Sequence, residues 1–398
     1  MQETTTNAEV GIGDFLASHG GPFFELQLRM GMLRENALRA ERRAAIFVAI
    51  AWGVPLLLSL IEGHAFGARD TTPYLLDFGA WARFFIATGL FLMTEQQVES
   101  GLRTKLDHFV QARIVAPGSL AAGAGAVATA LRRRNSRLTE SVCLAVAIVA
   151  SIAWLIRMQD AQTSTWAVQI GDGGAHLTLA GWWAVIFSAP IFYFLLLRGF
   201  WRYLVWAMLL WQIASLELRL VANHPDGKGG LGFIAEYPNA YSMFVFGVSS
   251  AVAVPVVHYV FENSVSSVTF GYLMTGWLAI VLAVFGFPLL AFSKPLSLLK
   301  EKSLQILGAQ ATDYYRQAER ALIGRNAVAA EPAETDPGAS VADPSAQFAL
   351  TRKLSTFVMS RTALVPVAAS ALAPFAIAGA TKLPYKEVLA LVKKLLVL

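Results

Sequence analysis

The stretch Leu177–Leu197, LTLAGWWAVIFSAPIFYFLLL, decides the fold of this chain because it contains no charged residue. An α-helix rises about 1.5 Å per residue, so about 20 mostly apolar residues cross a hydrocarbon core of about 30 Å. Lipid offers no hydrogen-bond partner to a free backbone N–H or C=O group, and a segment in that environment must therefore be helical. The stretch predicts a transmembrane helix.

Five further stretches pass the same test of length and apolar content. They are Ala44–Ile61, Phe78–Thr94, Ser141–Ile156, Tyr241–Phe261 and Val268–Phe292. The composition agrees, since 56% of the 398 residues are hydrophobic and only 15% are charged, whereas a soluble globular domain has roughly 25% charged residues. We therefore predict an all-α integral membrane protein with six transmembrane helices.

Two more apolar segments leave the number of crossings open. Phe200–Val221 follows the preceding span after only Arg198 and Gly199 and contains charged residues. It is either the second arm of a tight hairpin or a continuation of the same helix beyond the membrane. Ala363–Ala380 is rich in small residues and contains two prolines, so it crosses the membrane, re-enters it or lies along its surface. The total rises to seven or eight if one or both segments cross.

The distribution of basic residues favours the single long helix. Cytoplasmic loops of membrane proteins carry an excess of Lys and Arg, and the arginine-rich N-terminal arm is therefore assigned to the cytoplasm. If Phe200–Val221 crossed the membrane, the basic region after Phe292 would lie outside. We expect one helix from Leu177 to about Val221, whose second half projects into the cytoplasm.

Charge and apolar content divide the chain into membrane-embedded and cytoplasmic parts. The linker 326–346 is rich in Ala, Pro and acidic residues. It is too poor in apolar residues to bury a core, which predicts that it is disordered. The parts are a cytoplasmic N-terminal arm (1–43), a transmembrane core (44–292) with a cytoplasmic helical insertion (96–139) and a glycine-rich loop (222–238), a cytoplasmic helix (293–325), the linker (326–346) and an apolar segment with an amphipathic helix (347–398). The cytoplasmic helices would form a helical layer.

The sequence His224–Phe233, HPDGKGGLGF, is a candidate binding loop. Its glycines allow backbone conformations that other residues avoid, so that N–H groups can turn inward and hold an anion. A histidine that titrates near neutral pH and a carboxylate would suit a metal or a proton. The candidate binding residues are His224, Asp226, Lys228, Gly229 and Gly230. The alternative is a tight turn that only returns the chain to the membrane.

The same loop contributes to a resemblance. Taken with Arg113–Pro117 (RIVAP) after the pair His108–Phe109, and with Leu383–Leu389 (LPYKEVL), it makes the chain similar to a family of bacterial polytopic inner-membrane proteins of about this length. The resemblance covers most of the chain, and the loop is its most specific part. It implies a shared architecture in a bacterial cytoplasmic membrane and no substrate. The charge pattern places the N-terminus on the cytoplasmic side.

Three ionisable residues inside or at the end of predicted spans are candidates for a pore or gate, because charge is unfavourable in lipid. They are Arg83, Glu95 and His258. Each also has a structural interpretation. Arg83 can extend to the membrane surface beside Trp81, Glu95 can be a solvated helix end, and His258 can be a buried, hydrogen-bonded histidine.

Other function classes receive little support. The net charge of +5 reflects basic residues that face anionic lipid, and no basic stretch alternates with aromatic residues as in nucleic-acid-binding proteins. No zinc-helix, nucleophile-elbow or dinucleotide motif occurs, and a single cysteine, Cys143, cannot form a disulfide within the chain. The sequence assigns no cofactor and no metal.

Two function hypotheses remain. The first is a channel or transporter of unknown substrate, assembled as a homo-oligomer in the lipid bilayer. The second is a membrane-anchored sensor, or an enzyme that handles lipids or anions through the cytoplasmic helices and the glycine-rich loop.

Overall fold

The computed structural model describes residues 15–33, 38–66, 72–159, 164–171, 174–262, 267–329, 342–381 and 385–397. It is 78% helical, and within the described residues six helices are long and apolar enough to cross a membrane. They are Ala40–Glu62, Pro117–Met158, Leu179–Ala214, Gly232–Val260, Val268–Ile323 and Arg361–Ala380. The predicted class, an all-α polytopic membrane protein, is confirmed.

The six helices are not the same six that the sequence predicts. Arg361–Ala380, which contains the ambiguous segment Ala363–Ala380, is among them. The predicted span Phe78–Thr94 is not, although all of it is helical. Arg83 lies inside that span and Glu95 directly follows it, and both reduce the apolar content of the surrounding helix.

The prediction that Phe200–Val221 continues the preceding helix is confirmed, and the tight hairpin is excluded. Three segments form one continuous helix, namely α9 (Leu179–Trp183), the π-helical stretch η5 (Ala184–Ser188) and α10 (Ala189–Ala214). The helix ends at Ala214, earlier than the predicted end near Val221. Beyond it the chain is extended, and Leu218 forms an isolated β-bridge with Val115.

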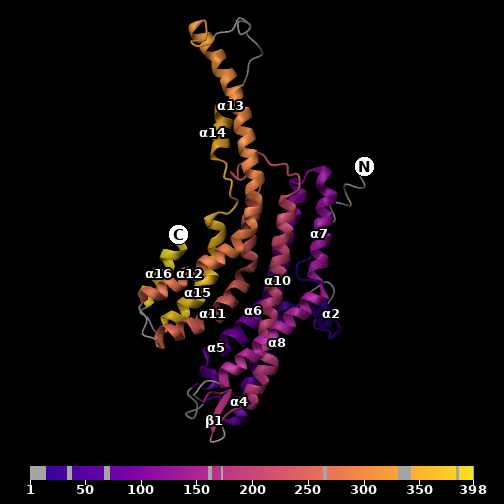
Figure 1. Ribbon diagram of the computed structural model, residues 1–398, viewed down its shortest axis with the longest axis vertical. Coiled ribbons are helices and arrows are strands. Elements are labelled where there is room, and N and C mark those ends of the chain that lie inside the picture. Colours follow the sequence, from indigo (N-terminus) through magenta and orange to yellow (C-terminus); the bar gives the residue numbers. More distant parts are fainter. Residues whose placement is uncertain are drawn as a thin grey trace.

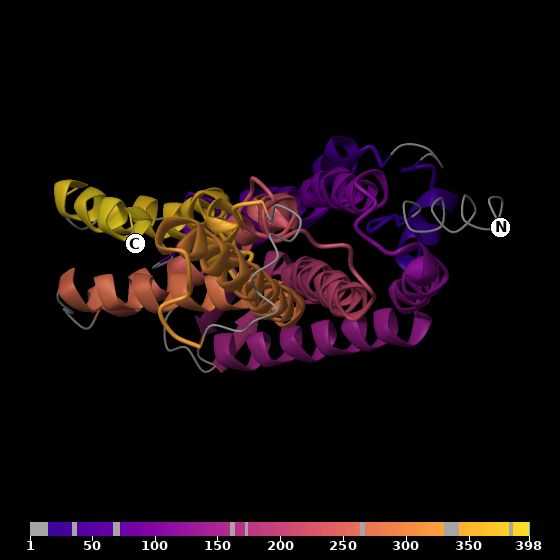
Figure 2. The same ribbon diagram turned by 90° about the horizontal axis from the view of Figure 1, so that it is seen from above.

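The helices form two groups that lie side by side (Figures 1 and 2). The N-terminal group includes α3, α4, α6, α8 and α10, and the C-terminal group includes α11, α12, α15 and α16. Helix α11 packs against α15 in its own group and against α6 in the other, so it joins the two. The bounds are α2 (Pro22–Arg29), α3 (Ala40–Val48), α4 (Val54–Glu62), α5 (Phe78–Ala80), α6 (Thr88–Gln111), α8 (Arg137–Gln159), α11 (Ser242–Glu262), α12 (Ser267–Gly286), α15 (Arg361–Ala380) and α16 (Tyr385–Val397).

Three π-helical stretches interrupt the helices of the N-terminal group. They are η1 (Ala49–Gly53), η3 (Trp81–Ala87) and η5. Pro55 and Pro190 closely follow η1 and η5. Because proline has no N–H, a carbonyl about one turn earlier loses its donor, and the helix can widen there. Since η1 contacts both η3 and η5, the irregular stretches meet inside the group.

One end of the molecule carries a small antiparallel hairpin that the sequence analysis did not predict. Strands β1 (Val168–Gly171) and β2 (Gly174–Leu177) pair Val168 with Leu177 and Gly171 with Gly174. Just before β1, the buried Trp166 packs edge-on against Tyr74, with ring centroids 4.7 Å apart. The hairpin lies at the foot of Figure 1, at the end opposite to α13.

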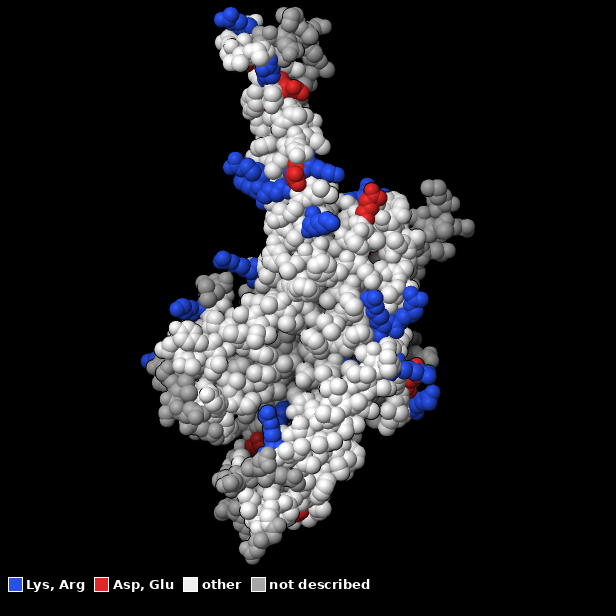
Figure 3. All heavy atoms as spheres, in the orientation of Figure 1, with Lys and Arg blue, Asp and Glu red and all other residues white. Residues whose placement is uncertain are grey.

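The opposite end contains helices that extend beyond the two groups. Helix α13 is 31 residues long, about 46 Å at about 1.5 Å per residue, and α14 packs against it (Figure 1). On the face drawn in Figure 3, charged side chains gather on this arm, at the upper end of the groups and along the right flank at mid-height, while the lower helices carry few of them. The bounds of the helices at this end are η4 (Pro117–Ser119), α7 (Leu120–Arg134), η6 (Gly232–Tyr241), η7 (Phe287–Phe292), α13 (Ser293–Ile323) and α14 (Ser345–Lys353).

The predicted linker 326–346 lies partly outside the described residues, at 330–341. Its first residue differs from the prediction, because Asn326 is buried and its amide donates hydrogen bonds to the Arg316 carbonyl at 3.0 Å and to Glu319 at 2.7 Å. Its last residues begin α14. The linker is therefore bounded on both sides by structured segments.

Candidate functional site

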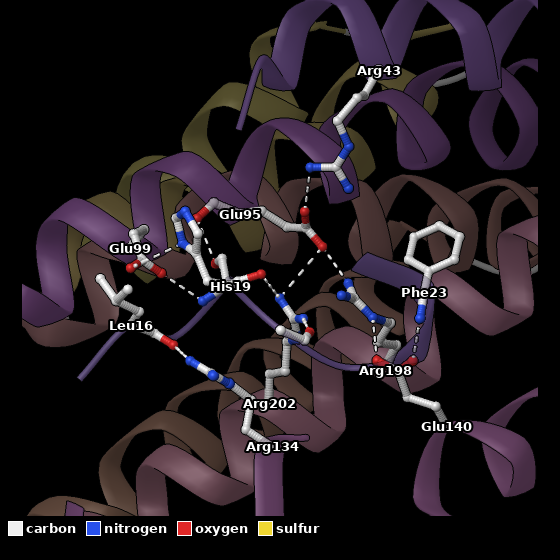
Figure 4. Close-up of polar contacts among 12 residues, drawn as sticks. Leu16, His19, Phe23, Arg43, Glu95, Glu99, Arg134, Glu140, Arg198 and Arg202 are labelled. Carbon is white, nitrogen blue, oxygen red and sulfur yellow. Dashed lines mark hydrogen bonds and ion pairs between the residues drawn. The ribbon is translucent and has the colours of Figure 1, made fainter. Parts of the chain in front are cut away.

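Glu95 is not a solvated helix end, because its carboxylate is buried among three arginines (Figure 4). Its Oε2 accepts a hydrogen bond from Arg43 Nη1 of α3 at 2.6 Å. Its Oε1 forms an ion pair with Arg198 of α10 and lies 3.6 Å from Arg202 Nη1, one turn further along the same helix. Three arginines from two helices thus converge on one carboxylate.

A second buried carboxylate extends this cluster. Glu140, in the first turn of α8, accepts a hydrogen bond from Arg198 Nε at 3.0 Å through Oε1. Its Oε2 accepts from the backbone N–H of Phe23 at 2.7 Å. The Arg198 guanidinium also lies 4.9 Å from the centroid of the Phe23 ring, an arrangement that favours a cation.

The segment Phe15–Phe23 closes the cluster with its backbone. Arg202 donates hydrogen bonds to the carbonyls of Ser18 at 2.7 Å and Gly20 at 3.0 Å. Ser18 in turn donates from Oγ to the Glu95 carbonyl at 2.7 Å. Gly20 has φ of +85°, a conformation that glycine adopts without strain. The N-terminal segment is thereby held against the charged centre of the bundle.

The cluster has an excess of positive charge. Arg43, Arg198 and Arg202 oppose two carboxylates, Glu95 and Glu140, and all five side chains are buried. At the edge of the cluster, Arg134 donates to the Leu16 carbonyl and Glu99 accepts from the Ser18 N–H, and these two opposite charges cancel. Buried charge is unfavourable unless it is compensated, so the remaining positive charge is a candidate for recognition of an anion.

Among the described residues, three cavities follow one another along the part of the continuous helix Phe78–Gln111 that runs from Arg103 to Arg83. A cavity of about 1070 Å³ is lined by Glu99 and Arg103 near its C-terminal end. A cavity of about 30 Å³ lies beside Glu95. A third, of about 400 Å³, is lined by Arg83 near the N-terminal end. Arg83 and Arg103 lie about 30 Å apart along the helix axis at about 1.5 Å per residue, so the two larger cavities open towards opposite ends of the bundle.

Aromatic side chains pack together on this helix between the levels of Glu95 and Arg83. The ring of Phe91 packs against Phe244 at 4.9 Å and against Phe192 at 6.0 Å between centroids. The helices approach closely here, because a Cβ atom on Gly247 would lie 3.0 Å from Phe91 and one on Gly199 would lie 2.5 Å from Phe244. The cluster is therefore closed on this side by an apolar constriction.

The structure brings two predicted site residues together at the third cavity. Arg83 and His258 both line it, with Asp77 and Tyr259. Arg83 donates from Nε to the Gly79 carbonyl at 3.0 Å, and its guanidinium lies 5.2 Å from the Trp154 ring. This contact replaces the expected partner Trp81.

The carboxylate of Asp77, which lines the same cavity as Arg83, is held by backbone and ring N–H groups. Its Oδ1 accepts from the N–H groups of Gly79 and Ala80, and its Oδ2 accepts from the Trp166 ring N–H at 2.8 Å. Within the described residues Arg83 forms no ion pair with a carboxylate. Among the described residues, the third cavity therefore presents a guanidinium and a carboxylate that do not form a direct ion pair.

In the glycine-rich loop, the ring of N–H groups is occupied by the loop's own carboxylate. Asp226 Oδ1 accepts from the N–H groups of Lys228 at 2.8 Å and Gly230 at 3.2 Å, and Oδ2 accepts from Gly232 at 2.8 Å. His224 Nδ1 lies 2.8 Å from Asp226 Oδ1. Burial alone would raise the pKa of the Asp226 carboxyl, but the backbone hydrogen bonds and His224 together lower it. The hydrogen bonds among these predicted binding residues stabilise a turn.

The loop also holds the base of the α13 arm. The Gly227 carbonyl accepts from the Ser355 N–H at 2.9 Å. Gly229 has φ of +67°, and a Cβ there would lie 2.9 Å from Leu296 of α13. The predicted binding residues His224, Asp226, Lys228, Gly229 and Gly230 therefore lie where the chain after α14 meets α13, away from the cluster around Glu95.

The sequence analysis missed most of the cluster. It named Glu95 but not Arg43, Arg198, Arg202 or Glu140. Arg198 was considered only as one of the two residues between the stretches Leu177–Leu197 and Phe200–Val221. The available signal was the spacing of Arg198 and Arg202, which are four residues apart and therefore share one helix face.

Comparison with known proteins adds no further assignment, because no family model, no curated protein and no solved structure matches this chain. In the part of the chain that the structure describes, no three His, Cys, Asp or Glu residues are grouped as ligands for a metal ion. The candidate site is defined by its own geometry.

Proposed function

We propose that this chain is a channel or transporter for small inorganic anions that acts as a homo-oligomer in a bacterial cytoplasmic membrane. One observation carries the proposal: a buried cluster with more guanidinium groups than carboxylates lies between two cavities at opposite ends of the helix Phe78–Gln111. Ionisable groups within membrane proteins commonly mark the pathway of an ion or substrate.

The order of groups along this helix supports a path. Arg103 lines the first cavity, Glu95 lines the second with Arg198 and Arg202, and Arg83 lines the third. The apolar constriction around Phe91 would be the gate, because Phe91 lies between Arg83 and Glu95 on the helix and packs closely against Phe244. The expected role of Arg83, Glu95 and His258 in a pore or gate is thus kept as part of the proposal.

The flux of anions into vesicles tests this function. The purified chain is reconstituted into vesicles that contain a halide-sensitive dye, and quenching is followed after external chloride is added. We expect quenching to be faster than in empty vesicles and faster still for Phe91→Ala, which widens the constriction. Phe187→Ala is the matched control, because Phe187 is exposed on η5. Rates equal to those of empty vesicles for all three proteins would contradict the proposal.

The proposed orientation places the N-terminus, the glycine-rich loop and the arm in the cytoplasm. The basic last turn of α7, with Arg132, Arg133 and Arg134, and the base of α13 support it. With Cys143 replaced by Ser, Lys228→Cys should react with an impermeant thiol reagent only after the membrane is opened. Labelling in intact cells would reverse the orientation.

The second class, a sensor or an enzyme that handles lipids or anions through the glycine-rich loop, receives less support. Asp226 already accepts the hydrogen bonds that an anion would accept from that loop.

A further inference from the structure

The small cavity beside Glu95 is lined by polar groups that lack partners. It has a volume of about 30 Å³ and lies between α6, α10 and α11. Arg198 Nη2, Arg202 Nε and Tyr241 Oη have no hydrogen-bond partner among the described residues. All three side chains line this cavity and are only 3%, 8% and 3% exposed. A buried donor without an acceptor is unfavourable, so an occupant of the cavity should accept hydrogen bonds.

The charge around the cavity favours an anion over water. The two oxygens of Glu95, the carboxylate that lines the cavity, already interact with Arg43 and Arg198. With Glu140 included, three buried arginines still face two carboxylates. A water molecule would accept hydrogen bonds but would leave this charge unbalanced in surroundings of low dielectric constant, where a counter-charge is strongly attracted.

The volume and the other walls restrict what the anion can be. A single water needs about 10–15 Å³ of such volume, so a cavity of about 30 Å³ suits one large monatomic ion or two waters and is small for an organic acid of several carbons. Phe91, Phe244 and Leu195 form its apolar walls. An ion that enters must lose most of its water, and a weakly hydrated monatomic anion loses it most easily.

We propose that this cavity binds one dehydrated halide ion, held by hydrogen bonds from Arg198, Arg202 and Tyr241. The site rests on the proposed function and gives it a substrate class, since a halide leaving the cavity would next meet the apolar constriction around Phe91. Chloride is the abundant halide that fits it.

Direct binding tests the site independently of transport. The full chain in detergent is dialysed against radioactive chloride with gluconate as the balancing anion, and its thermal unfolding is followed in chloride, bromide and gluconate at equal ionic strength. We expect one chloride per chain at saturation and a melting temperature that rises with chloride or bromide, because a ligand of the folded state stabilises it by mass action. Absence of both effects would overturn the proposal and leave water as the occupant.

Halide binding by the Tyr241→Phe variant tests where the ion binds. This variant removes one donor without changing the ring, and it should weaken halide binding about ten- to hundredfold, the usual range for a hydrogen bond to a charged group. Tyr203→Phe is the matched control, because Tyr203 is also buried but donates to the Val284 carbonyl and does not line the cavity. Equal loss of binding in both variants, or no loss in either, would contradict this placement.

The two proposals fail in different ways. Halide binding that depends on Tyr241 but is accompanied by no flux would retain the site and reject transport. Flux that is unaffected by Tyr241→Phe, with no measurable binding, would retain transport and reject this cavity as its site.

Discussion

The cluster around Glu95 and the glycine-rich loop both surround a carboxylate with hydrogen-bond donors, but they differ in how the donors are used. In the loop, Asp226 accepts bonds from neighbours within a few residues, and its two oxygens satisfy the N–H groups that the glycines expose. Around Glu95 the donors come from α3 and α10, and some of them remain without an acceptor. A saturated network is a structural element, whereas an unsaturated buried one leaves room for a ligand.

Among the substitutions that test this comparison, Glu95→Gln should cause the largest loss of stability. The substitution leaves Arg43, Arg198 and Arg202 buried with one carboxylate fewer, and removing one partner of a buried ion pair typically destabilises a protein by about 3–5 kcal/mol. Thermal unfolding of the purified chain measures it. The control is Glu236→Gln, because Glu236 is 59% exposed and pairs with Lys105, so that it contributes at most about 1 kcal/mol. Similar losses in both variants would mean that the cluster is solvated.

Asp226→Asn should give a smaller and more local effect. Asparagine retains one acceptor oxygen but loses the other, which leaves an N–H group of the loop without its acceptor and costs about 1–3 kcal/mol. Since the loop contacts the base of α13, we expect faster proteolysis between Gly324 and Ser345 with little change in the bundle. Lys228→Gln, the control, should behave like the unmodified chain. If it instead abolished stabilisation by an added phosphate, the loop would be an anion site after all.

The smallest expected effect is the change in melting temperature at acidic pH. The pKa of Asp226 is lowered in the folded chain, so its contribution to stability is complete above the ordinary carboxyl pKa of about 3.9 and is lost as the pH falls through the lowered value. Between about pH 5 and pH 3 the melting temperature should fall more steeply for the unmodified chain than for Asp226→Asn. Parallel curves would show that the carboxylate contributes nothing to folding.

The sequence predicts the class of fold well because lipid imposes one simple rule, a long apolar helix, and this rule is visible in stretches such as Leu177–Leu197. It predicts Glu95 as unusual for the same reason, since charge stands out against an apolar background. It does not predict the partners. Arg43, Glu95, Glu140 and Arg198 lie far apart in the sequence, and no local spacing indicates that they meet.

The glycine-rich loop is the opposite case. Its contacts are local, so its turn could be anticipated from His224–Phe233 alone, and this prominence made it the natural candidate for a binding site. The residues with unsatisfied donors lie instead in helices whose sequences are otherwise ordinary. Arg198 and Arg202 share one face of α10, and that spacing was the local sign that the helix has a polar, inward-facing side.

The backbone of Phe15–Phe23 completes a cluster whose arginines on α10 are made much later in synthesis. While the chain is being made, Arg43, Glu95 and Glu140 are therefore present before Arg198 and Arg202, and the N-terminal segment gains its hydrogen bonds to Arg202 only after α10 has joined the bundle. The completion of its docking is consequently a late event in assembly. The first part of the described chain to leave the ribosome is among the last to reach its final position, and it closes the bundle from the N-terminal side.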